Sequence, residues 1–402
     1  MGITTLERDA VNNQTTRWYA VRATEALVQN GRDATGDKGG ATTPATTGRE
    51  PGVLARLRSI SNSISNSISR RASKGISCFA GLLGIVWLTL GAGHAAEGEP
   101  DSSSPALILV VGAGGNPQYD ITFYQWSERW ESAAKQVGMA VTVIGRHRGE
   151  IEVKETDYSR LEAAIKQSQG AVHSELWIVL IGHGTFDRRV AKFNLRGPDF
   201  SAEELNQWLK PVDRPTAIIN CSSASGPFIS TLAGPQRVVI TGTKSGTEVN
   251  FSRFGDQLSH AITDPAADLD KDNQTSLWEA FLLASRRTTE YYDTDGRVAT
   301  EHALLDDNGD GQGVRADQFR GLAPLAKPAA GQSLDGRKAH QWHLISNATD
   351  AKLSPQDRLR RNELELAVEN LRDRKDQRPE EDYRVELEQL LVELAELNER
   401  VE

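Results

Sequence analysis

A cysteine and a histidine each follow a β-type apolar run, at positions where thiol chemistry is possible. Cys221 comes directly after the run Thr216–Asn220 and precedes a series of small residues that ends in Gly226. His183 follows the run Leu176–Ile181 and has a glycine on either side. Because the carboxyl ends of parallel strands share one crevice, the two strands would deliver thiol and imidazole to the same place. A Cys–His pair is the minimum set for nucleophilic catalysis by a thiol.

The segments that must position this pair alternate between strand and helix, which predicts an α/β domain with a mostly parallel sheet and helices on both faces. The helix at 201–209 begins with a Ser cap and has Glu204 at the capping-box position. The predicted strands are 106–111, 140–144, 175–181, 216–220 and 237–241. The predicted helices are 124–137, 158–167, 201–209, 226–232 and 253–262.

An apolar run near residue 80 predicts export. Residues 53–74 are basic, the run extends from about Ile76 to Leu90, and small residues follow up to Ala96, which is the order of a secretory signal. We predict a signal peptide over about 75–96 and a secreted or periplasmic protein. An uncleaved membrane anchor is the alternative, although the run is short for a membrane span.

Removal of this signal would leave Cys221 as the only cysteine, because the chain has two and the other is Cys78. An unpaired thiol in an exported protein is either buried and inert or kept for chemistry. Residues 1–52 lack hydrophobic periodicity, and we predict that they are disordered. A signal this far from Met1 is unusual, so we expect translation to begin near Val53 or Leu54 from an alternative start codon.

Acidic loops within residues 264–318 contain a pattern typical of calcium sites. The run D-L-D-K-D-N-Q-T-S-L-W-E spans Asp268 to Glu279 and places oxygen side chains as in an EF-hand loop. The shorter run Asp306–Gly313 resembles the first half of such a loop. Solvated turns with an acidic helix cap are the alternative interpretation. The predicted calcium ligands of the first loop are Asp268, Asp270, Asp272, Gln274, Ser276 and Glu279.

The pattern of the last 80 residues predicts a linker followed by a helical tail. The Pro/Gly/Ala-rich stretch that begins at Ala323 predicts a linker over 323–353, which separates the domain at 104–322 from a helical tail at 354–402. In the tail, apolar residues recur at four-three spacing on both sides of Pro379. This spacing predicts a helical hairpin or a short coiled coil, and we expect self-association through these helices. Packing of the tail on the main domain is the alternative.

The composition excludes one class of partner. The chain has 402 residues, and its 46 Lys and Arg are outnumbered by 55 Asp and Glu. A nucleic-acid-binding protein normally presents a basic face, so we predict that nucleic acid is not a partner.

The two chemical motifs resemble those of a known family. G-H-G at His183 and N-C-S-S-A-S-G from Asn220 to Gly226 are similar to the His-Gly and Cys motifs of legumain-like cysteine peptidases, which are relatives of caspases and gingipains. The segment Val238–Asp256 is similar to the strand and loop that wall their substrate pocket. The resemblance covers about Ala106–Phe281, and it implies a caspase-like three-layer sandwich.

The resemblance also implies a role for each matching residue. Cys221 would attack the scissile carbonyl as a thiolate, and His183 would act as base and then as acid. The backbone N–H groups of Gly184 and Cys221 would form the oxyanion hole. Legumains orient the histidine with an asparagine after their first strand, and Asp120 falls nearest to that position. Thr122 stands where legumains carry an arginine that reads the P1 side chain, so we predict no P1 residue.

Two classes of function follow from these residues. The first is an exported cysteine endopeptidase that acts on a peptide or protein substrate through a thioester, or a transpeptidase with the same dyad; neither needs a cofactor for the chemistry. The second is a catalytically silent caspase-like module that binds calcium and partners. The presence of both Cys221 and His183 favours the enzyme.

Overall fold

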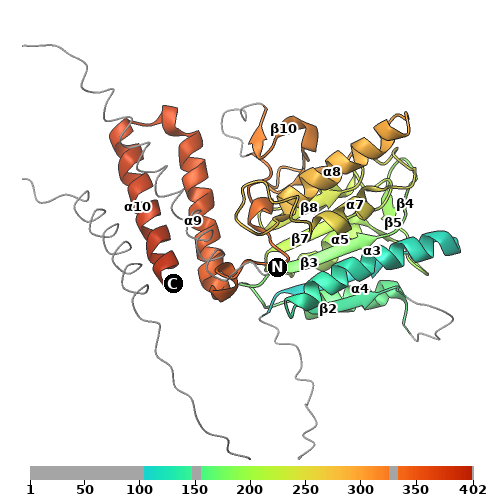
Figure 1. The fold of residues 1–402 in the computed structure, drawn as a ribbon. Coiled ribbons are helices and arrows are strands. Elements are labelled where there is room, and N and C mark those ends of the chain that lie inside the picture. The colour runs from blue at the N-terminus through green and yellow to red at the C-terminus, as the bar shows by residue number, and fades with distance from the viewer. Residues whose placement is uncertain (1–103, 147–154, 326–333, 401–402) are drawn as a thin grey trace, which may run out of the picture. The chain divides into compact units, whose positions relative to one another are not determined.

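The computed structural model describes residues 104–146, 155–325 and 334–400. Its centre is a six-stranded sheet in the order β2-β1-β3-β7-β8-β9 (Figure 1). The strands are β1 (Ala106–Val111), β2 (Ala140–Ile144), β3 (Leu176–Ile181), β7 (Thr216–Asn220), β8 (Arg237–Thr241) and β9 (Leu304–Asp306). Strand β9 is antiparallel to β8, and the other five run parallel. The predicted mostly parallel α/β sheet is therefore confirmed.

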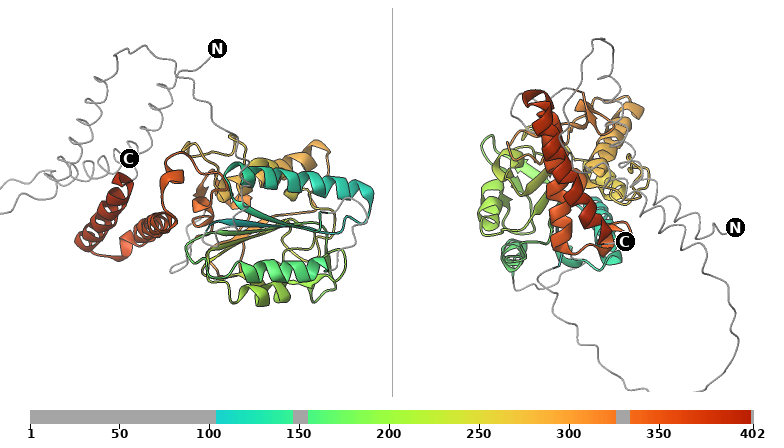
Figure 2. Two further views of the ribbon diagram at one scale, coloured as in Figure 1. Left: turned by 90° about the horizontal axis from the view of Figure 1, so that it is seen from below. Right: turned by 90° about the vertical axis from the view of Figure 1, so that its left-hand side faces the viewer.

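Helices cover both faces of this sheet, as the edge-on view in Figure 2 shows. One layer contains α3 (Pro117–Gln136), α7 (Phe254–Ala261) and α8 (Leu277–Thr294), and the other contains α4 (Asp157–Gln167), α5 (Ala202–Leu209) and α6 (Phe228–Leu232). Successive residues of a strand point to opposite faces. On β3, Trp177 and Val179 accordingly join the core beneath α3, while Ile178 and Leu180 join the core beneath α4 and α5.

Several short strands were not predicted. β4 (Gly184–Phe186), β5 (Ala191–Phe193) and β6 (Phe200–Ser201) form a three-stranded antiparallel sheet directly after His183. A further pair, β10 (Phe319–Arg320) and β11 (Ala323–Pro324), follows the short 3-10 helix η2 (Ala316–Gln318). Strands of two or three residues are too short to show an alternating pattern, so tertiary pairing alone determines them.

The predicted linker over 323–353 is wrong in its second half. Residues 334–353 contain the 3-10 helices η3 (Ala339–Gln341) and η4 (Asp350–Lys352) and pack on the domain. Trp342 is 7% exposed, and its ring lies 5.1 Å from that of Trp177 in the core. The buried aromatic surface holds this segment in place, because burial of an aromatic side chain removes a large apolar area from water.

The tail consists of α9 (Pro355–Asp373), the 3-10 helix η5 (Lys375–Gln377) and α10 (Glu380–Glu399). Ser354 caps α9, and Pro355 is the first residue of the helix. The two helices lie side by side (Figures 1 and 2), with Arg360 2.7 Å from Glu393 across them. Arg361 of α9 lies 2.5 Å from Asp350 of η4, so α9 also contacts the domain.

No helix within the described residues combines the length and apolarity needed to cross a membrane. The predicted disordered segment at 1–52 and the predicted signal peptide at 75–96 lie outside the described residues.

Candidate active site

Pairing of β3 with β7 brings the predicted dyad to one edge of the sheet. Leu180 is the register partner of Asn220, and the Cys221 N–H donates to the Leu180 carbonyl at 2.9 Å. Both candidate residues face the α3 layer. The His183 ring lies 5.1 Å from that of Phe123 on α3, and Cys221 belongs to the core cluster beneath the same helix.

His183 sits in an aromatic environment. Its ring makes edge contacts with Tyr119 at 4.8 Å, Phe123 at 5.1 Å and Phe251 at 6.0 Å. Burial lowers the pKa of His183, against the opposing effect of a hydrogen bond to the backbone of Gly114. The imidazole is therefore neutral near pH 7, which is the form that a general base requires.

The thiol of Cys221 is closed off from solvent. The residue is 1% exposed, and burial, together with the negative charge of Glu301, raises the pKa of Cys221 to about 12. Among the described residues, no hydrogen bond joins the thiol to His183 or to another group. The thiolate is the nucleophilic form of cysteine, so the thiol would have to gain exposure and a lower pKa before it could attack a substrate.

The amides predicted for the oxyanion hole already have partners. The Gly184 N–H donates to the Ser223 hydroxyl at 3.2 Å, and that hydroxyl lies 3.2 Å from the Gly184 carbonyl. The role of Gly184 stays a prediction that requires Ser223 to move. The prediction that the Cys221 N–H forms part of the oxyanion hole is wrong in this conformation, because this N–H donates to the carbonyl of Leu180 on β3.

Asn220 shapes the loop that carries the cysteine. Its carboxamide oxygen accepts from the Ser222 N–H at 3.0 Å and from the Ser222 hydroxyl at 2.7 Å. This local turn places Ser222 and Ser223 against Gly184. This role of Asn220 was not predicted. An Asn at the end of a strand commonly accepts a hydrogen bond from the backbone two residues further on, and this is a recognisable turn signal.

Asp120 does not contact His183, so the prediction that it orients the imidazole directly is wrong. Its carboxylate accepts from the Gly114 N–H at 3.2 Å and from Arg196 at 2.6 Å. The backbone of Gly114 also makes a hydrogen bond to His183. Asp120 is therefore connected to the imidazole through the loop that contains Gly114. Arg196 lies 76 residues away in sequence, and no local pattern pointed to it.

Three of the predicted calcium ligands come together. Oxygens of Asp268, Asp270 and Asp272 lie within 4.8 Å of one another. The Asp268 carboxylate accepts from the Lys271 N–H at 2.6 Å and from the Asn273 N–H at 3.2 Å. Lys271 and Asn273 have φ values of 65° and 68°, in the left-handed region, so the chain turns around the carboxylates. Burial and the neighbouring Asp270 raise the pKa of Asp272 to about 6.

The remaining predicted ligands of this loop are engaged differently. Glu279 lies with Asp270 and His340 in a second group whose ligand atoms are within 4.8 Å of one another. Ser276 caps α8 and exchanges hydrogen bonds with Glu279, while the Gln274 side chain donates to Asp272 at 2.8 Å. His340 was not predicted as a ligand, because it lies on η3, far along the chain from the loop Asp268–Glu279.

The second acidic loop repeats the turn of the first. Asp306 accepts from the N–H groups of Gly309 at 2.8 Å and Gly311 at 2.6 Å. Asp335 accepts from the Asp307 N–H at 2.9 Å, which ties this loop to the segment that had been predicted as a linker.

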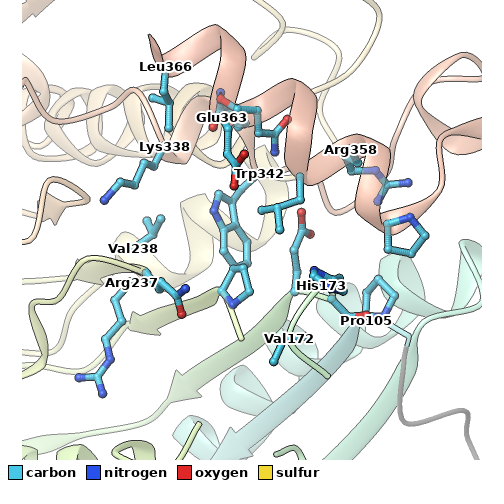
Figure 3. Close-up of a pocket in the computed structure, with 18 of the residues that line it drawn as sticks. Pro105, Val172, His173, Arg237, Val238, Lys338, Trp342, Arg358, Glu363 and Leu366 are labelled. Atoms are coloured by element: carbon cyan, nitrogen blue, oxygen red, sulfur yellow. The ribbon is translucent and has the colours of Figure 1, made fainter. Parts of the chain in front are cut away.

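A cavity of about 300 Å³ lies at the opposite, amino-terminal edge of the sheet, between the strands and α9 (Figure 3). Pro105, His173, Arg237, Trp342 and Glu363 are among the residues that line it. The dyad follows the carboxyl ends of β3 and β7, so this cavity is separate from the candidate active site.

We expect Gly184→Ala to destabilise the protein. A Cβ atom at Gly184 would lie 2.2 Å from the Ser223 carbonyl oxygen, so the loop after Cys221 would have to shift. Such overpacking typically costs about 1–3 kcal/mol. The matched control is Gly234→Ala, whose Cβ would meet nothing closer than 3.5 Å. Thermal melting of both variants checks this, and equal melting temperatures would contradict it.

Comparison with known proteins gives a structural likeness but no family. The sequence matches no protein family and no curated protein. Among solved structures, the chain is similar to the crystal structure of the Drosophila initiator caspase Dronc, with 11% identity and a TM-score of 0.35. The match covers 60% of this chain and 98% of the caspase chain.

Proposed function

We propose that the chain is a cysteine endopeptidase of the legumain- and caspase-like type, with Cys221 as nucleophile and His183 as general base. The observation that carries the proposal is the register of β3 and β7, which sets both residues on one sheet edge and one face. The neutral imidazole beside the Gly114 backbone supports the same assignment. The export predicted from residues 75–96 would make it an exported enzyme.

The reaction would proceed in two steps. His183 takes the thiol proton, Cys221 attacks the scissile carbonyl, and a thioester forms as the imidazolium protonates the departing amine. Water then attacks the thioester, with His183 again as base, and the thiol is regenerated. An amine in place of water would make the enzyme a transpeptidase. Asp120 and Arg196 would hold the Gly114 loop, and through it the imidazole.

Covalent labelling tests this proposal. Peptide acyloxymethyl ketones react with thiol peptidases at the nucleophile, so a library of them should label wild-type protein but not Cys221→Ala. The amino acid at P1 of the reactive members would identify the specificity.

A catalytically silent module is the second candidate, and the closed thiol favours it. It predicts that Cys221 stays unlabelled by every peptide reagent, while small alkylating reagents reach the cysteine only after denaturation.

We also propose that the loop Asp268–Glu279 binds calcium as a structural ion. Carboxylates converge there, and the raised pKa of Asp272 reflects burial and repulsion that a divalent cation would relieve. After chelator treatment, calcium should stabilise the folded protein by roughly 2.7 kcal/mol at a hundredfold excess over its dissociation constant, and so raise the melting temperature. Asp270→Ala should remove most of this gain, and Asp293→Ala, on the exposed end of α8, should keep it. An unchanged melting curve in millimolar calcium would refute the site.

We further propose that α10 mediates self-association. Val385 and Val392 on this helix are 48% and 39% exposed, at a spacing that places them on one face. Light scattering of the full chain should show a dimer, and Val385→Glu combined with Val392→Glu should yield a monomer. A monomeric wild-type chain would contradict the proposal.

A further inference from the structure

Glu301 is a buried carboxylate outside the predicted dyad. It is 4% exposed and lies between the end of α8 and the start of α7. One oxygen accepts from the Ser252 hydroxyl at 2.7 Å and from the Phe254 N–H at 3.1 Å, and the other accepts from the Tyr292 hydroxyl at 3.0 Å. Both oxygens accept from the backbone N–H of Arg253, at distances within 2.9 Å. These donors fasten the segment Phe251–Phe254, here termed the latch.

The latch contacts His183, and the residue that follows the latch contacts Cys221. The Phe251 ring stacks on Tyr119 at 4.7 Å and lies 6.0 Å from the His183 ring. Directly after the latch, Gly255 packs so closely that a Cβ atom there would lie 2.7 Å from the Cys221 Cβ. Residues that Glu301 fastens therefore cover the imidazole, and the helix turn that follows covers the thiol.

The same carboxylate adds a negative charge near the thiol, on top of the larger effect of burial. The latch leads into the amino terminus of α7, whose cap residue Arg253 makes no side-chain capping bond. A helix amino terminus carries partial positive charge and stabilises a nearby thiolate. Here Glu301 takes the first N–H groups of that terminus and adds a full negative charge, which raises the pKa of Cys221 beyond the effect of burial.

We infer that Glu301 is a positioning residue that keeps Cys221 closed and protonated by fastening the latch over the dyad. This regulation rests on the proposed role of Cys221 as the nucleophile. Glu301 and Phe254 also line a cavity of about 470 Å³ bounded by α8 and η2, which leaves space for the carboxylate to move when the latch opens.

Alkylation of the native full-length chain by iodoacetamide tests the inference. The Cys221 peptide is quantified by mass spectrometry, with the Cys78 peptide as internal reference. Glu301→Gln preserves the shape of the side chain and removes its charge, so we expect Cys221 to react about tenfold faster at neutral pH, which is the effect of a one-unit fall in thiol pKa. The pH midpoint of alkylation should fall with it.

Two further variants separate charge from coverage. Glu290→Gln is the matched control, because Glu290 is 62% exposed on α8 and should leave the rate unchanged. Phe251→Ala loosens the latch over His183 and keeps the Glu301 charge, so alkylation should accelerate while the pH midpoint falls less than in Glu301→Gln. A folded Glu301→Gln variant with the wild-type rate and midpoint would overturn the inference.

Alternative outcomes are distinguishable. If Glu301→Gln does not fold, Ser252→Ala removes one anchoring donor and should still accelerate alkylation; an unchanged rate in this variant would overturn the inference. Peptide hydrolysis is measured in parallel. Faster alkylation without any hydrolysis supports the role of Glu301 and counts only against the proposed peptidase function.

Discussion

Cys221→Ala and His183→Ala should each abolish peptide hydrolysis while leaving the fold intact. Removal of one member of a nucleophile–base pair typically costs about 10³-fold or more in turnover. In the proposed mechanism the two residues act as a unit, so the double variant should lose no more activity than either single one. Turnover of a fluorogenic peptide, selected from the labelling library, measures the effect.

Three controls sharpen this prediction. Cys78→Ser removes the other cysteine and should keep full activity. Asp120→Asn should cause a smaller loss, since Asp120 reaches the imidazole only through Gly114. Circular dichroism should show a native spectrum and a cooperative melting transition for the Cys221 variant. Near wild-type turnover in either alanine variant would remove the mechanism.

Arg214→Ala should lower the free energy of unfolding more than either Arg214→Lys or Arg286→Ala. Arg214 is 3% exposed, and its guanidinium donates to the carbonyls of Ser174 at 2.7 Å, Glu175 at 2.6 Å and Ser104 at 3.1 Å. These carbonyls border the amino-terminal ends of β1 and β3. Truncation would remove three hydrogen bonds from a charged donor, which typically contribute about 1.5–3 kcal/mol each, so we expect a total loss of about 3 kcal/mol or more.

The matched comparison is Arg286→Ala, whose side chain is 63% exposed and pairs with Glu290 on the surface of α8. An exposed pair of this kind contributes about 0–1 kcal/mol. Arg214→Lys should fall between the two, because it keeps the charge and loses the planar fork. Chemical denaturation measures all three. If Arg214→Ala lowered the free energy of unfolding no more than Arg286→Ala, the carbonyls would have other hydrogen-bond partners when the guanidinium is removed, and the prediction would be wrong.

The sequence by itself determined the elements and the place of the dyad. Apolar runs of five or six residues mark the parallel strands, because strands buried on both faces need continuous hydrophobic segments. Local chemistry also determined the helix starts at Ser201 and Ser354, where a side chain reaches only three residues ahead. The prediction that Cys221 and His183 share an edge needed only the rule that parallel strands end together.

Only the tertiary structure decided the state of that dyad. The surroundings of the dyad come from Phe251, which contacts His183, from Gly255 in the first turn of α7, which contacts Cys221, and from Glu301, which lies beyond α8. The contacts of Asp120 with Arg196 and of Asp270 with His340 likewise join segments far apart in the chain. Burial and charge at a site sum over all such neighbours, so no local pattern specifies them. The sequence therefore placed Cys221 and His183 at one edge of the sheet, and long-range packing sets the burial and the charge around them.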